Sequence, residues 1–199
     1  MIRFLLISIG IFLLFGCSTI KPPVTEYRIT TDAKVTDIDS NGCKNKSLKI
    51  AQAFSQNSLM SLKMNYILSN KKMFSYSQAH WSETPNRAVS LELLKQIRDT
   101  KLFKYTQNYK SRSRSDLLLE TNIEDFIQYY NDDLSKSHAV ITISFSLIDM
   151  KTNMTIADKT FSSKIIASSN DAIGGANALN NALDSVLLKT RLWLGEICK

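Results

Sequence analysis

The side chains best able to do chemistry are the three cysteines, and the first of them has a distinctive setting. Cys17 follows an apolar run over residues 4–15 that is broken only by a serine and a glycine. The run is too short to span a bilayer but has the length of the apolar part of a secretion signal. Leu14, Gly16 and Cys17 together resemble a bacterial lipobox, in which the nucleophilic sulfur takes a diacylglyceryl group through a thioether. The sequence therefore predicts a lipoprotein signal peptide over residues 1–16 and a lipid anchor, the site of palmitate attachment, on Cys17.

The residue after Cys17 bears on the destination of the chain. In bacteria with two membranes, an aspartate at that position retains a lipoprotein at the inner membrane, whereas this chain has Ser18. We therefore expect an outer-membrane location facing the periplasm. Residues 17–25, which include Pro22 and Pro23, are predicted to form a short tether, and residues 26–199 are long enough for a single domain with its own core.

Cys43 and Cys198 form an even pair, which can become a structural disulfide in an oxidising periplasm. The spacing alone leaves open whether they are bridged. No Cys-x-x-Cys motif and no grouping of histidine, cysteine and acid at ligand spacing is present in the sequence. We therefore expect neither a metal site nor a cofactor.

Two histidines, His80 and His138, are the remaining candidates for acid–base work. His80 stands beside Trp81 and could stack on a ligand, but a histidine at the end of a strand is more often structural. Trp81 and Trp193 are most simply core or rim aromatic residues. No serine lies in the glycine pattern of a nucleophile elbow.

Two further pairs of neighbours have simple structural interpretations. Glu124 and Asp125 lie in a predicted strand, where consecutive side chains point to opposite faces, so we do not expect a carboxylate pair. Gly174 and Gly175 lie inside a predicted helix, which favours close packing of that helix on a sheet over a phosphate loop. The sequence thus predicts no catalytic residues and a role other than catalysis.

The net charge of +7 comes partly from three basic clusters. A nucleic-acid partner is not expected behind a secretion signal. The clusters allow two interpretations, which are attraction to anionic lipid headgroups or an acidic protein, and a merely solvated surface. Their members are Lys44, Lys46 and Lys49, then Lys71 and Lys72, then Lys110, Arg112 and Arg114.

Hydrophobic periodicity and turn residues predict the elements that would position these side chains. Thr84 and Pro85 predict a helix that runs to about Thr100. A final helix is expected after Ser169 as its N-cap, while residues 57–72 are compatible with a short helix or an irregular strand. The predicted strands cover residues 26–29, 48–54, 73–81, 102–107, 117–129, 139–147 and 154–166.

The second half of the chain shows the clearest alternation. Over residues 117–129, five odd positions are apolar and the even positions between them are mostly polar. The apolar residues are Leu117, Leu119, Ile123, Ile127 and Tyr129, and the polar ones are Glu120, Asn122, Glu124 and Gln128. Odd positions are apolar again over residues 139–147, which indicates half-buried antiparallel strands. The order of elements predicts an α+β fold, a mostly antiparallel sheet with two helices packed on one face.

Several short motifs, in this order and behind a lipobox, resemble the ABC-type transport auxiliary lipoproteins, the outer-membrane partners of Mce-type lipid transporters such as the paraquat-inducible system. The loop over residues 32–47 and the two cysteines beyond the lipobox depart from the family pattern. The matching motifs are Tyr27-Arg28-Ile29, Phe74-Ser75-Tyr76, Trp81 with Pro85 as a W-x-x-x-P helix start, the strand over 119–128, Ser146-Leu147-Ile148-Asp149 and the stretch over 178–183.

The resemblance implies a docking or structural role in moving lipids between the inner and outer membranes. Its implied partners are an Mce-family protein with an inner-membrane permease and ATPase, and self-association into a homo-oligomer is left open. The family offers no catalytic residues to transfer to this chain. The alternative is an outer-membrane assembly lipoprotein of a lipopolysaccharide-assembly or secretion complex. A periplasmic hydrolase is disfavoured because no nucleophile is paired with a base.

Overall fold

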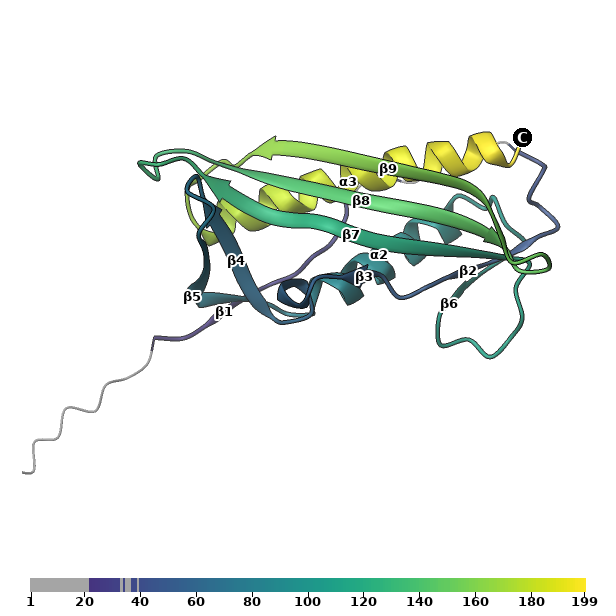
Figure 1. Ribbon diagram of the computed structural model, residues 1–199, viewed down its shortest axis with the longest axis horizontal. Helices are drawn as coiled ribbons and strands as arrows, with labels where there is room; N and C mark the ends of the chain where they lie inside the picture. Colours follow the sequence, from purple (N-terminus) through teal and green to yellow (C-terminus); the bar gives the residue numbers. More distant parts are fainter. Residues whose placement is uncertain (1–21, 33, 35–36, 39) are drawn as a thin grey trace, which may run out of the picture.

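The computed structural model describes residues 22–199 except residues 33, 35, 36 and 39. These residues form a nine-stranded sheet with two α-helices on one face, which confirms the predicted fold class (Figure 1). In chain order the elements are β1 (Thr25–Tyr27), β2 (Ser47–Ile50), β3 (Phe54–Ser55), the 3-10 turn η1 (Asn57–Leu59), β4 (Lys63–Leu68), β5 (Met73–Trp81), α2 (Pro85–Asp99), β6 (Tyr105–Asn108), β7 (Leu117–Tyr130), β8 (Ser137–Asp149), β9 (Met154–Ile166) and α3 (Ala172–Ile197).

Antiparallel pairing joins the long strands, because β8 pairs along its length with β7 on one side and with β9 on the other. The second edge of β7 is lined by β2, β3 and β4, which all run parallel to it. β6 then extends the sheet beyond β2, while β5 and β1 extend it beyond β4. The parallel pairs were not predicted, since a strand of two to six residues does not encode its partner in its own alternation.

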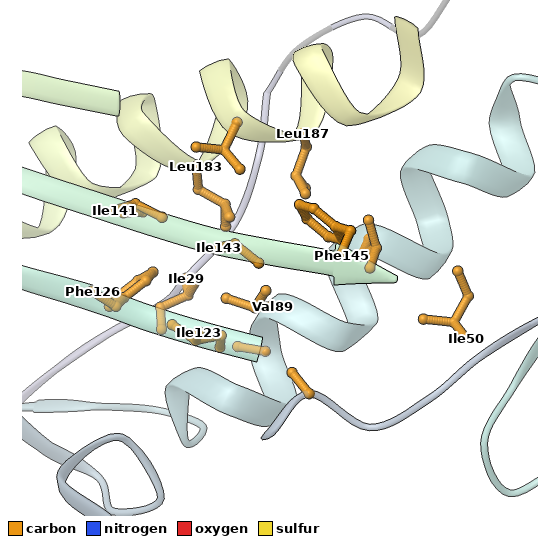
Figure 2. Packing of buried hydrophobic residues seen from close by; sticks show 14 of the residues in the cluster. Ile29, Ile50, Val89, Ile123, Phe126, Ile141, Ile143, Phe145, Leu183 and Leu187 are labelled. Carbon is orange, nitrogen blue, oxygen red and sulfur yellow. The ribbon is translucent and has the colours of Figure 1, made fainter. Parts of the chain in front are cut away.

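The core lies between the sheet and the two helices. Side chains of α3 such as Leu183 and Leu187 point toward β8, and Val89 of α2 is buried in the same layer (Figure 2). Burying one such side chain stabilises the fold by about 1.5–3 kcal/mol. The β8 residues in this core are Ala139, Ile141, Ile143, Phe145 and Leu147.

A β-bulge in β7 changes the expected pattern of faces. Ile123 pairs with Ile143, but Asp125 pairs with Thr142, so Glu124 is an extra residue in β7. Beyond the bulge the even positions turn toward the helices, since an inserted residue shifts the alternation by one. The interpretation of Gln128 as an outward polar residue was therefore wrong, because Gln128 is fully buried.

Both helices form close to where they were predicted. α2 begins at Pro85, although the Thr84 side chain forms no capping hydrogen bond. Ser169 as the N-cap of α3 was wrong, because the cap is Asp171, which accepts a hydrogen bond from Gly174 N at 2.9 Å. Ser169 lies two residues before the cap and donates to the Asp171 carboxylate at 2.6 Å.

Three predicted segments differ in detail from the structure. The strand expected over 48–54 is divided into β2 and β3, and residues 57–72 form η1 followed by β4. The strand expected over 102–107 begins only at Tyr105, since Leu102 and Phe103 are buried in the connection that leads from α2.

Candidate functional site

The N-terminal segment joins the domain at one end of the molecule. The predicted lipidation residue Cys17 and the sorting residue Ser18 lie outside the described residues. The chain enters through exposed residues 22–24 and forms β1, which pairs with the end of β5. In Figure 1 this point lies at one end of the long axis, beside β4 and β5. Among the described residues, no helix is long and apolar enough to cross a membrane.

The opposite end contains a disulfide between Cys43 and Cys198, with Cα atoms 5.1 Å apart. Both residues are buried, and Gly42 N donates a hydrogen bond to Cys198 O at 2.7 Å. The bond thus fastens the loop before β2 to the end of α3. Ser40 Oγ also donates to Cys198 O, and no group of metal-ligating side chains is found among the described residues.

The same end brings two of the predicted basic clusters together. Lys104 N donates to Lys46 O at 2.9 Å, and Met150 N donates to Asp116 O at 2.9 Å, so three connections meet there. We call the cations on residues 43–49, 104–116 and 149–152 the distal basic surface. Its members are Lys44, Lys46, Lys49, Lys104, Lys110, Arg112, Arg114 and Lys151. The third predicted cluster, Lys71 and Lys72, lies in the β4–β5 turn at the opposite end (Figure 1).

A pocket of about 150 Å³ opens beside the distal basic surface, between α2 and the end of β6. Its apolar lining comes from Ile50, Leu91 and Leu94, and Tyr109 with Lys110 forms one wall. Arg87 also lines the pocket and pairs with Glu83 at 3.4 Å. We call this the α2–β6 pocket. The pocket could not be predicted from the sequence because its lining comes from three separate segments, and only the structure shows that Leu91 of α2 is exposed.

Glu124 and Asp125 both lie on the outer face of β7. The prediction that their side chains point to opposite faces was wrong. The bulge turns both toward the face without helices, where Ser144 Oγ donates to Glu124 and Tyr129 OH donates to Asp125 at 2.7 Å. Burial raises the pKa of the Asp125 carboxyl, and the Tyr129 hydrogen bond opposes that shift. Tyr129 also stacks on His138, with ring centroids 5.6 Å apart.

The remaining candidates have packing roles. Trp81 is buried edge-on against Phe126, with ring centroids 5.9 Å apart. His80 lies half-buried in β5, between the positions of Glu26 and Lys63 on the neighbouring strands. Trp193 of α3 lies 6.5 Å from Phe145, ring to ring.

A polar network links β5 and β7 to the start of α3. Gln128 accepts from Tyr76 OH at 2.9 Å and donates to Ser137 Oγ at 2.9 Å, while Tyr76 and Tyr130 share a hydrogen bond of 2.6 Å. Burial raises the pKa of Tyr76, so its phenol stays neutral. A Cβ on Gly175 would overlap the Gln128 amide, which supports the predicted close packing of this helix on the sheet.

The comparisons with known proteins identify the fold and no more. No family model matches the chain, and no curated protein matches it. The structure of XCC0632 from Xanthomonas campestris, described by the family model DUF330, is similar with a TM-score of 0.76 and 20% identity, over 86% of this chain and 94% of that one. An uncharacterized protein is similar with a TM-score of 0.65 and 11% identity, over 87% of this chain and 99% of that one.

A lipoprotein is also among the more distant likenesses. GNA1162 from Neisseria meningitidis aligns with a TM-score of 0.32 and 10% identity, over 73% of this chain and 96% of that one. A likeness at that level carries no argument about function. The family suggested by the motifs therefore remains a prediction.

Proposed function

We propose that the chain is an outer-membrane-anchored periplasmic lipoprotein that serves as the auxiliary component of an Mce-type ABC transporter, which moves lipids between the two membranes. The observation that carries the proposal is the lipobox at residues 14–17, followed in order by the motifs of the auxiliary lipoproteins. The role is docking or support and needs no catalytic residue of its own.

The structure of the motif residues supports this assignment. Tyr27 belongs to β1, directly after the tether, and Trp81 ends β5 in the core. Pro85 then begins α2, so the W-x-x-x-P motif marks a real junction between strand and helix. These residues maintain the fold at the anchored end and do not form a catalytic group.

The first experiment tests the anchor. A Cys17→Ser variant should lose labelling by radioactive palmitate and leave the outer-membrane fraction, because serine cannot form the thioether. A Cys43→Ser variant keeps Cys17 and should still be labelled, which controls for the loss of a cysteine. A Cys17→Ser variant that is lipid-free yet restores envelope integrity fully in a deletion strain would contradict the proposal.

The second experiment tests the partner. Crosslinking of the lipidated protein in intact cells of its host should yield an adduct with an Mce-domain protein, identified by its peptides. Adducts with a β-barrel or a secretin alone would favour the assembly-lipoprotein alternative instead. A gene neighbourhood with an Mce protein, a permease and an ATPase would add independent support.

A further inference from the structure

The charge of the distal basic surface is not balanced locally. Its three segments carry eight lysines and arginines but only two carboxylates, Asp116 and Asp149. Both carboxylates already accept hydrogen bonds, from Ser47 to Asp116 and from the Lys151 and Thr152 amides to Asp149. The four ion pairs found among described residues all lie outside this surface. An unbalanced set of cations of this kind attracts an anionic partner.

Lys49 helps to hold the surface in shape. Lys49 Nζ donates to the carbonyl oxygens of Ser111 at 3.2 Å and Ser113 at 2.8 Å. These bonds hold the β6–β7 connection against β2. Arg112, between the two serines, and Arg114, after the second, are both exposed. The arginines are therefore presented on an ordered loop, which lowers the entropy cost of binding.

The α2–β6 pocket continues this surface, since Lys110 belongs to both and the neighbouring Tyr109 lines the pocket. A dry cavity of about 150 Å³ is known to accommodate a ring of benzene size. The pocket of that volume therefore fits one large apolar side chain. Tyr109, with 36% of its surface exposed, lines the pocket itself. Tyr105, 59% exposed at the start of β6, lies against Lys104 of the distal basic surface. Exposed tyrosine and arginine around an apolar recess is the composition of a protein-binding hot spot.

We propose that the distal basic surface and the α2–β6 pocket form one docking site for an acidic segment of a partner protein, with one large apolar side chain of that segment in the pocket. The proposal rests on the proposed function for the orientation of the domain. Its recognition chemistry rests on the charges and the pocket alone.

The position of the site favours a protein over the anchoring membrane. β7 has 14 residues and spans about 45 Å between the tether end and the distal end. Residues 17–24 reach about 28 Å at full extension. A domain standing on this tether presents the distal basic surface to the periplasm, and a bare headgroup would also leave the apolar pocket unused.

The test uses a photo-crosslinking benzoylphenylalanine at Tyr105 in the full lipidated protein, in its host. We expect an adduct whose peptide, read by mass spectrometry, is rich in Asp and Glu. The same probe at Phe74, which is exposed at the tether end, should not capture that peptide. The triple variant Lys110→Glu, Arg112→Glu, Arg114→Glu should lower the adduct yield at least tenfold. The matched reversal Lys71→Glu, Lys72→Glu, Lys136→Glu should leave the yield within twofold.

A second pair of variants tests the pocket. Leu91→Trp should fill it and lower the yield by a similar factor, whereas Leu188→Trp, at an exposed leucine of α3, should not. Thermal unfolding of each variant checks that it folds. An adduct with the mass of a phospholipid, or a yield that both charge reversals change equally, would overturn the proposal.

The outcomes separate this proposal from the proposed function. Capture at Tyr105 of an acidic peptide from a protein without an Mce domain would keep the docking site and contradict the transporter role. Capture of an Mce protein only at Phe74 would support the transporter role and overturn the docking site.

Discussion

Gly175 shows how one hydrogen atom in place of a side chain sets the distance between α3 and the sheet. A Cβ there would overlap the amide of Gln128, which is fully buried and held by several hydrogen bonds. We therefore expect Gly175→Ala to lower the free energy of unfolding by about 1–3 kcal/mol, despite the higher helix propensity of alanine. Urea unfolding followed by circular dichroism measures the change.

The matched control lies in the same helix. A Cβ on Gly195 would come 2.9 Å from Ile38 Cγ2, the end of a side chain that can turn away. Gly195→Ala should therefore change the free energy of unfolding by less than about 0.5 kcal/mol or raise it slightly. Equal losses for both substitutions would mean that overlap with Gln128 is not the cause.

Asp171 makes the stability of α3 depend on pH. Hydrogen bonds from Ser169 and from Gly174 N lower the pKa of the Asp171 carboxyl below its unfolded value of about 3.9. A group with a lowered folded-state pKa stabilises the fold above the unfolded pKa and loses that contribution as the pH falls through the folded value. The cap should thus be at full strength at neutral pH and weaken below about pH 4.

Two substitutions separate the cap from the charge. Asp171→Ala should lower the free energy of unfolding at pH 7 by about 1 kcal/mol, the usual value of an N-cap. Asp171→Asn keeps a capping oxygen, so it should cost less at pH 7 and lose less stability than the native chain between pH 5 and pH 2.5. The free energy of unfolding is measured by urea unfolding at each pH. If it falls equally for the native chain and the Asp171→Asn variant as the pH is lowered, the carboxylate charge does not matter.

At the scale of elements, the regularity of the hydrophobic pattern decided which strands and helices could be predicted. β8 and α3 were foreseeable because each has an uninterrupted pattern, with period two in β8 and about 3.6 in α3. β7 was foreseen as a strand, but the bulge at Glu124 was not, since an extra residue leaves no mark on composition. One residue thus exchanged the faces of Ile127 and Gln128, and with them the interpretation of the Glu124–Asp125 pair.

The disulfide is the covalent link between two elements that lie far apart in sequence. Replacing Cys43 and Cys198 together by serine should lower the free energy of unfolding by about 2–5 kcal/mol, since the bond closes a loop of 155 residues in the unfolded chain. A reductant should lower the stability of the native chain to a similar level and leave the double variant unchanged. Urea unfolding with and without reductant measures both, and a reductant effect of the same size on the double variant would contradict this assignment.

At the scale of the whole molecule, the fold class followed from the order of elements, but the candidate site did not. Lys71 with Lys72 and Lys110 with Arg112 are similar pairs in the sequence, and only the topology separates them by the length of β7. The α2–β6 pocket needs β2, α2 and the end of β6 in contact, and no local pattern encodes that meeting. The sequence therefore identified the basic clusters, and the fold showed which of them lie at the same end of the molecule.

On the proposed export route, the order in which the two bridged cysteines enter the periplasm has a consequence for biogenesis. Cys43 arrives before any of β2 to β9, whereas Cys198 arrives only after α3. A chain stalled during export would offer the thiol of Cys43 to oxidants with no native mate available, and would stay open to mispairing or proteolysis. On that route, the native bond between Cys43 and Cys198 can therefore form only after the whole sheet and α3 have been exported.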